Sequence, residues 1–62
     1  MTVPTAPSIE TSPKDGRWYQ IPTTANAEKY VRWKNGGYQV LTKTYLDGSG
    51  AYQWSMQMIS LN

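Results

Sequence analysis

The sequence predicts an all-β fold: a small antiparallel meander of three to four strands that follows a disordered or extended N-terminal arm. Between Lys29 and Asn62, apolar or aromatic residues alternate with polar ones, which is the period of a strand with one buried face. Two glycine-containing turn signals, KNGG and DGSG, interrupt the alternation. We therefore expect an extended Pro/Thr/Ser-rich arm over residues 1–15 and a single small β domain over residues 16–62.

The arm has too few apolar side chains to form a core of its own. Pro4, Pro7 and Pro13 fix their own φ angles and push the preceding residues toward extended conformations, so a helix is not expected. Two interpretations remain open. The arm is either a disordered tail, or a segment that orders on a neighbouring molecule by inserting Val3 and Ile9 into its grooves.

A first short strand is expected at residues 17–21. The turn signal at residues 13–16 leads into it, and Pro22 ends it because proline cannot donate a hydrogen bond to a neighbouring strand. Residues 22–28 are expected to form a loop, with one helical turn at residues 26–29.

The next two strands are joined at Asn35-Gly36, the strongest hairpin signal in the chain. A type I′ turn needs a positive φ at both central positions, and Asn followed by Gly adopts it readily. Closing this turn fixes the cross-strand partners, which are Trp33 with Tyr38, Val31 with Val40, and Glu28 with Lys43.

The length of the second turn decides the register of the last strand. A two-residue loop would place the large apolar residues of that strand on the face of Gln39 and Lys43. A three-residue loop at residues 47–49, with a bulge at Gly50, would place them beside the apolar residues of the first hairpin. Because burial favours one common apolar face, we expect the odd-numbered loop. The expected interface is then Val31, Trp33, Tyr38, Val40, Tyr52, Trp54, Met56 and Met58.

The opposite face mixes aromatic, polar and basic side chains. Its candidate ligand-binding platform consists of Tyr30, Arg32, Lys43 and Tyr45. Two interpretations remain open for this face. It is either a solvated surface, or a contact surface for a protein, a sugar or single-stranded nucleic acid, whose bases stack on aromatic side chains.

Composition limits what can reinforce this domain. The chain has 62 residues and contains neither Cys nor His, which excludes disulfides and a zinc site with nitrogen or sulfur ligands. Self-association, or docking on a larger protein, is therefore the expected reinforcement. The formal net charge of +2 is too small to favour nucleic acid as the partner.

We do not expect an enzyme, and we expect no cofactor. The chain lacks a histidine base, a thiol nucleophile and a glycine-rich phosphate loop. Among its carboxylates, Glu28 is best explained by a cross-strand pair with Lys43. There is no apolar stretch long enough to cross a membrane and no secretory signal, so we interpret the sequence from Met1 as a complete small protein.

Two groups of residues follow a known pattern. The first is a turn of proline, a basic residue, aspartate and glycine that leads to a tyrosine, here Pro13, Asp15, Gly16 and Tyr19. The second is a hairpin with a tight glycine turn, here Tyr30-Val31-Arg32, Asn35-Gly36, Tyr38, Val40-Leu41 and Thr44-Tyr45-Leu46. This pattern resembles the foldon, the C-terminal trimerisation domain of phage fibritin, and related domains of phage fibre and whisker proteins. The resemblance implies self-association around a three-fold axis, with Trp33, Tyr38 and Val40 at the subunit interface.

The function that we expect is that of a non-enzymatic phage virion-type structural or assembly protein that self-associates through the aromatic face of its sheet. The resemblance favours a homotrimer or a larger protein assembly, in the virion or in the host cytoplasm. The alternative is a monomeric SH3-like binding module that contacts a host protein, a glycan or single-stranded nucleic acid. A third hypothesis is a phage-encoded inhibitor that caps a host protein, for instance by adding a strand to its sheet.

Overall fold

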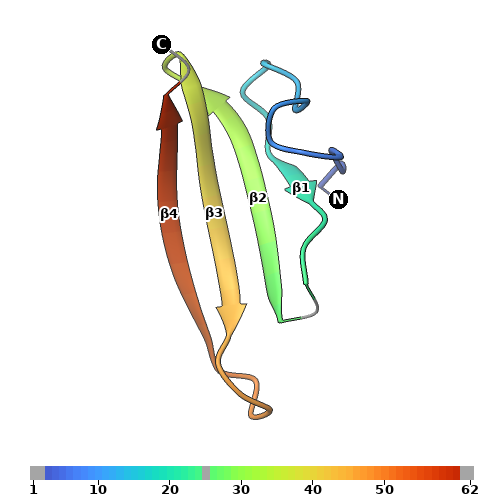
Figure 1. Cartoon of the computed structure of the whole chain (residues 1–62), viewed down its shortest axis with the longest axis vertical. Coiled ribbons are helices and arrows are strands. Elements are labelled where there is room, and N and C mark those ends of the chain that lie inside the picture. Colours follow the sequence, from blue (N-terminus) through green and yellow to red (C-terminus); the bar gives the residue numbers. More distant parts are fainter. Residues whose placement is uncertain (1–2, 25, 61–62) are drawn as a thin grey trace.

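The computed structural model describes residues 3–24 and 26–60, which form one four-stranded antiparallel sheet and contain no helix (Figure 1). The strands are β1 (Tyr19–Ile21), β2 (Ala27–Lys34), β3 (Gly37–Tyr45) and β4 (Tyr52–Ser60). They lie side by side in sequence order, which confirms the predicted all-β meander.

The start of β2 differs from the prediction. A helical turn was expected at residues 26–29, but β2 already begins at Ala27. The reason is that the pairing of β2 with β3 continues one residue before Ala27, where the Tyr45 N–H donates to the Asn26 carbonyl at 2.8 Å. Backbone groups used in this ladder are not available for a helical turn.

The first hairpin has the predicted turn and the predicted register. Asn35 and Gly36 have φ angles of 55° and 81°, as a type I′ turn requires. The observed partners include Trp33 with Tyr38, Val31 with Val40, and Glu28 with Lys43. A local conformational requirement at two residues therefore fixes the pairing of two long strands.

One face of the sheet carries the core, and we call it the covered face. Its buried residues are Ile21, Val31, Tyr38 and Val40, and Ile9, Tyr19, Trp33 and Ile59 pack against them. Val31 and Tyr38 are 0% and 1% exposed, so the centre of this cluster is closed to solvent. The small core therefore lies across β1, β2 and β3, with one contribution from β4.

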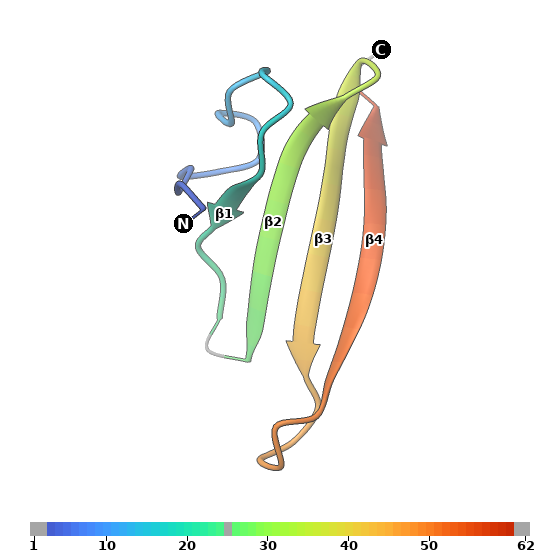
Figure 2. The same ribbon diagram turned by 180° about the vertical axis from the view of Figure 1, so that it is seen from behind.

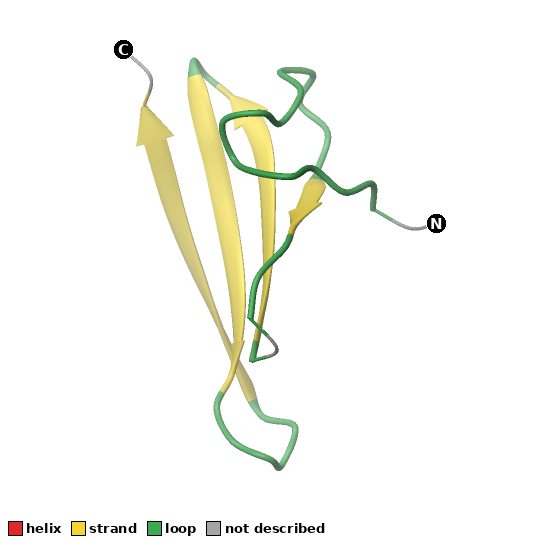
Figure 3. Ribbon diagram, turned by 45° about the vertical axis from the view of Figure 1, so that its right-hand side comes forward, coloured by secondary structure: helices red, strands yellow, loops and turns green. Residues whose placement is uncertain are grey.

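The N-terminal segment, residues 3–18, covers the part of this face that contains the core, whereas β4 residues on the same side, such as Ser55, stay exposed (Figure 3). It lies beside β1, where the Ala6 N–H donates to the Gln20 carbonyl at 2.9 Å and the Gln20 N–H donates to the Pro4 carbonyl at 2.8 Å. Farther along, the buried Tyr38 hydroxyl donates to the Ser12 carbonyl at 2.8 Å. Residues 3–15 of the predicted arm therefore pack on the chain's own sheet, and neither a disordered tail nor ordering on a neighbour describes them. Residues 1–2 of that arm lie outside the described residues.

The second hairpin corrects the predicted register. Tyr45, Lys43, Leu41 and Gln39 lie opposite Tyr52, Trp54, Met56 and Met58, respectively. The Leu46 N–H donates to the Ala51 carbonyl at 2.9 Å, which leaves an even-numbered loop, Asp47–Gly50. The Asp47 carboxylate accepts hydrogen bonds from the backbone N–H and the hydroxyl of Ser49, and Gly50 takes a φ of 92° to close the loop.

The predicted single apolar face is therefore wrong. Opposite residues of an antiparallel pair point to the same side, so the large β4 residues share a face with Lys43 and Gln39. The eight expected interface residues divide into two sets. Val31, Trp33, Tyr38 and Val40 are on the covered face, whereas Tyr52, Trp54, Met56 and Met58 are on the other, which we call the open face.

The contact between Tyr38 and Ser12 yields a first prediction. In Tyr38→Phe the buried Ser12 carbonyl loses its donor, so the free energy of unfolding should fall by about 1–3 kcal/mol. Chemical denaturation measures this change. The control is Tyr52→Phe, because Tyr52 is 50% exposed and its hydroxyl has no hydrogen bond within the described residues. Equal stability of Tyr38→Phe and the wild type would contradict the role of this anchor.

Candidate functional site

Four large apolar side chains stand in a row on the open face, along β4. We call Tyr52, Trp54, Met56 and Met58 the β4 strip, and they are 50%, 49%, 61% and 51% exposed. They project to one side because successive side chains of a strand alternate between the two faces. The β3 residues beside them on the same face, such as Leu41, are only half-exposed. The strip is thus the most exposed apolar part of the sheet.

The aromatic end of the strip is ordered by ring contacts around one cation. Tyr52 packs edge to face against Tyr45 and Trp54, with centroid separations of 6.4 and 6.2 Å. The Lys43 Nζ lies 4.3 Å from the centroid of the Tyr52 ring, and the rings of Tyr45 and Trp54 are 5.2 and 5.8 Å away. Cation–π attraction therefore holds the three rings and the ammonium group together before any partner binds.

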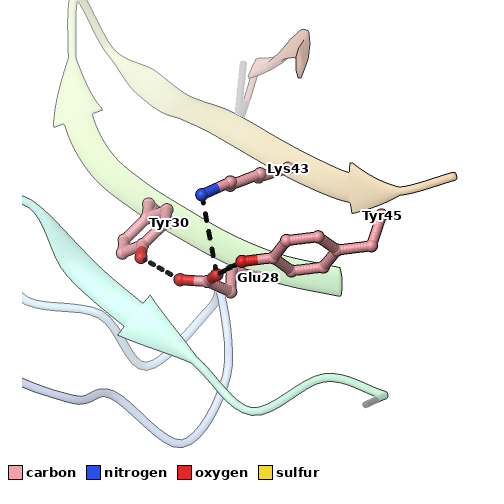
Figure 4. A network of polar contacts seen from close by, with 4 residues as sticks. All are labelled: Glu28, Tyr30, Lys43 and Tyr45. Carbon is pink, nitrogen blue, oxygen red and sulfur yellow. Dashed lines mark hydrogen bonds and ion pairs between the residues drawn. The ribbon is translucent and has the colours of Figure 1, made fainter. Parts of the chain in front are cut away.

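A carboxylate on β2 ties this cluster to the middle of the sheet (Figure 4). The hydroxyl of Tyr30 donates to Glu28 Oε1 at 2.7 Å, and the hydroxyl of Tyr45 donates to Oε2. Lys43 Nζ lies 4.0 Å from the same Oε2, which confirms the predicted pair of Glu28 with Lys43. The hydrogen bond from the Tyr45 hydroxyl, and to a smaller extent that from the Tyr30 hydroxyl, holds the pKa of Glu28 below its usual value of 4.5.

Arg32, another basic residue of the open face, is also held by contacts with its neighbours. Arg32 Nε donates to Gln39 Oε1 at 2.7 Å, and its guanidinium lies 4.7 Å from the centroid of the Trp18 ring. Gln39 in turn donates from Nε2 to Met56 Sδ at 3.0 Å. These contacts connect β2, through β3, to the β4 strip.

The structure brings together residues that the sequence had assigned to separate surfaces. The predicted platform of Tyr30, Arg32, Lys43 and Tyr45 shares the open face with the β4 strip. Trp18 was missed as a member of this surface. Its signal was present in the sequence, because the alternation through the predicted first strand places it on the same side as Gln20, which lies opposite Tyr30.

The open face supplies apolar contact, ring stacking and cation–π binding. Within residues 3–24 and 26–60 we find no pocket, and no three His, Cys, Asp or Glu side chains are grouped as metal ligands. The same residues include no helix that is long and apolar enough to cross a membrane. The candidate site is therefore a surface rather than a cavity.

Comparisons of the chain with protein families, curated proteins and solved structures found no match. The resemblance to the foldon therefore remains a prediction. Of the residues that it assigns to a three-fold interface, Tyr38 and Val40 are 1% and 3% exposed. They would be accessible to another subunit only if the N-terminal segment moved away.

The carboxylates predict how stability depends on pH. The pKa of Glu28 is lowered by the tyrosine hydroxyls, that of Asp15 by the Arg17 N–H, and that of Asp47 by the Ser49 hydroxyl. A group with a lowered folded-state pKa stabilises the fold above its unfolded pKa and loses that effect on acidification. The free energy of unfolding should therefore be level near neutrality and fall as the pH drops below about 4.5.

Urea denaturation at a series of pH values measures this dependence. In Glu28→Gln the loss of stability between about pH 6 and pH 3 should be smaller than in the wild type, because one of the three groups no longer titrates. The Tyr45 hydroxyl raises the pKa of Lys43, the cation paired with Glu28, so Lys43 stays protonated throughout that range. An identical pH dependence in the two proteins would show that the hydroxyl contacts do not hold the Glu28 carboxylate.

Proposed function

We propose that this protein is a non-enzymatic structural or assembly protein of the phage-virion type that associates with further copies of itself through the open face. The observation that supports the proposal is the β4 strip: four adjacent large apolar side chains, each 49–61% exposed. Soluble monomers rarely leave a contiguous apolar patch of this kind in contact with water.

The total accessible surface of the chain also supports self-association. The accessible surface is 4449 Å², whereas a compact monomer of this mass has about 4000 Å². Burying one large apolar side chain completely is worth roughly 1.5–3 kcal/mol, and the strip residues are about half-exposed, so much of that free energy is still available to association.

The surroundings of the strip also fit a contact surface. Protein interfaces have an apolar centre with aromatic residues and Met, and a polar rim. Here the strip is bordered on β3 by Gln39 and Lys43, and beyond them on β2 by Arg32 and Glu28. This proposal moves the contact surface away from Val31, Tyr38 and Val40, which the chain covers by itself.

The binding-module alternative has less support. Its platform residues are already paired, because Tyr30 and Tyr45 donate to Glu28 and the Arg32 guanidinium lies against Trp18. A glycan or a nucleic acid that hydrogen-bonded to these polar groups would have to break these contacts. Self-association through the strip breaks none of them.

Mass in solution tests the proposal. Sedimentation of the full chain from micromolar to millimolar concentration should show a mass that rises to a multiple of the 7.0 kDa protomer. Trp54→Ser should weaken this association by at least about tenfold, because it removes the largest side chain of the strip. The matched control is Leu46→Ser, which removes a 59%-exposed apolar residue from the covered side. A wild type that stays monomeric over the whole range would contradict the proposal.

A further inference from the structure

The two edges of the sheet are built differently (Figure 1 and Figure 2). β1 has three residues, is followed by Pro22, and is flanked by the N-terminal segment through the bridge between Thr5 and Gln20. β4 has nine residues and contains neither a charged residue nor a proline, and no described residue lies beyond it. Natural proteins usually protect a long edge strand with charges, proline or a covering segment. β4 therefore has the features of an edge that receives another strand.

The backbone of β4 is oriented for such pairing. Because the Leu46 N–H donates to the Ala51 carbonyl, hydrogen bonds to β3 fall on alternate β4 residues: Gln53, Ser55, Gln57 and Ile59. The backbone N–H and C=O groups of the residues between them point away from the sheet. Those residues are the members of the β4 strip.

The exposure of the strip is itself an effect of the edge. On the same open face, the β3 residues Leu41, Lys43 and Tyr45 are only half-exposed because a strand flanks them on each side. The strip residues have a neighbouring strand on one side and are 49–61% exposed. A strand added next to β4 would give them the surroundings that the β3 residues already have.

The sequence of β4 is complementary to itself when it is reversed about Ser55. In an antiparallel pair centred there, Ser55 meets Ser55 of the second copy and Gln53 meets Gln57 on one face. On the open face Trp54 meets Met56 and Tyr52 meets Met58, which are favourable contacts between sulfur and aromatic rings. This match of polar with polar and of aromatic with Met indicates a second copy of the chain as the occupant.

Charge does not oppose this arrangement, although each copy carries a net charge of +2. β4 has no charged residue, and the nearest cation on the open face is Lys43, one strand away. Lys43 side chains of two paired copies would be separated by three strand spacings, roughly 14 Å or more, which exceeds the screening length at physiological salt.

We propose that β4 pairs in antiparallel register with β4 of a second copy, about a two-fold axis at Ser55, to form a continuous eight-stranded sheet. Roughly eight backbone hydrogen bonds would join the copies. The two-fold axis runs perpendicular to the sheet, so both open faces lie on the same side and their strips merge. This inference rests on the proposed self-association and specifies a dimer in place of the trimer that the resemblance implies.

Introducing a positive or a negative charge at Ser55, on the two-fold axis, is the first test. Ser55 is exposed, so Ser55→Lys and Ser55→Glu should both fold, and each should weaken the dimer by about tenfold at low ionic strength because like charges face each other. An equimolar mixture of the two variants should recover the dimer. In the control, Gln53→Lys, the new lysine faces Gln57 of the second copy, and affinity should change by less than about threefold.

Amide hydrogen exchange provides an independent readout on the wild type. Exchange at Trp54 and Met56, whose N–H groups point away from β3, should slow by at least about tenfold as the concentration rises, while exchange at loop residue Gly48 stays fast. A dimer with fast exchange at both residues and no effect of the Ser55 variants would overturn edge pairing and leave the proposed self-association standing. A protein that is monomeric at millimolar concentration overturns both.

Discussion

The loop Asp47–Gly50 determines which side chains β4 presents to each face of the sheet. Side chains on a strand alternate with a period of two, so an even-numbered loop sends Trp54 and Met56 to the open face and Ser55 to the covered side. The loop is stabilised locally, by hydrogen bonds from Ser49 to the Asp47 carboxylate and by the left-handed conformation of Gly50. In the opposite register, Tyr52, Trp54, Met56 and Met58 would lie on the covered side of β4. In the observed register, Ile59 is the only β4 residue that packs against the core.

The two faces of the sheet have different roles. On the covered face, the N-terminal segment supplies the reinforcement that a domain without disulfides needs, through the pairing of Ala6 with Gln20 and the anchor from Tyr38 to Ser12. On the open face, the network from Glu28 to Lys43 and the aromatic rings organises the strip without covering it. The surface left exposed is thus an ordered one, which lowers the conformational entropy lost on association.

The sequence was sufficient where a local requirement decides the structure. Asn35-Gly36 specifies a turn type, and the turn type specifies every pair from β2 to β3, including Glu28 with Lys43. It was insufficient at DGSG, because that loop is compatible with more than one length, and the preference for one common apolar face favoured the wrong one. The cover formed by residues 3–18 was also missed, since its contacts join residues far apart in the sequence and follow no periodic pattern. Of the candidate site, Tyr30, Arg32, Lys43 and Tyr45 were placed together correctly, but their neighbours on β4 were not.

The separation of Trp33 and Trp54 onto opposite faces is the most direct consequence of this register. Nuclear Overhauser effects from the Trp54 indole measure it in solution. Cross-peaks from Trp54 to the side chains of Lys43 and Tyr52 are predicted, because Lys43 Nζ and the two rings lie within about 6 Å of one another. Cross-peaks from Trp54 to Val40 or Val31 would place it on the covered face and contradict the account.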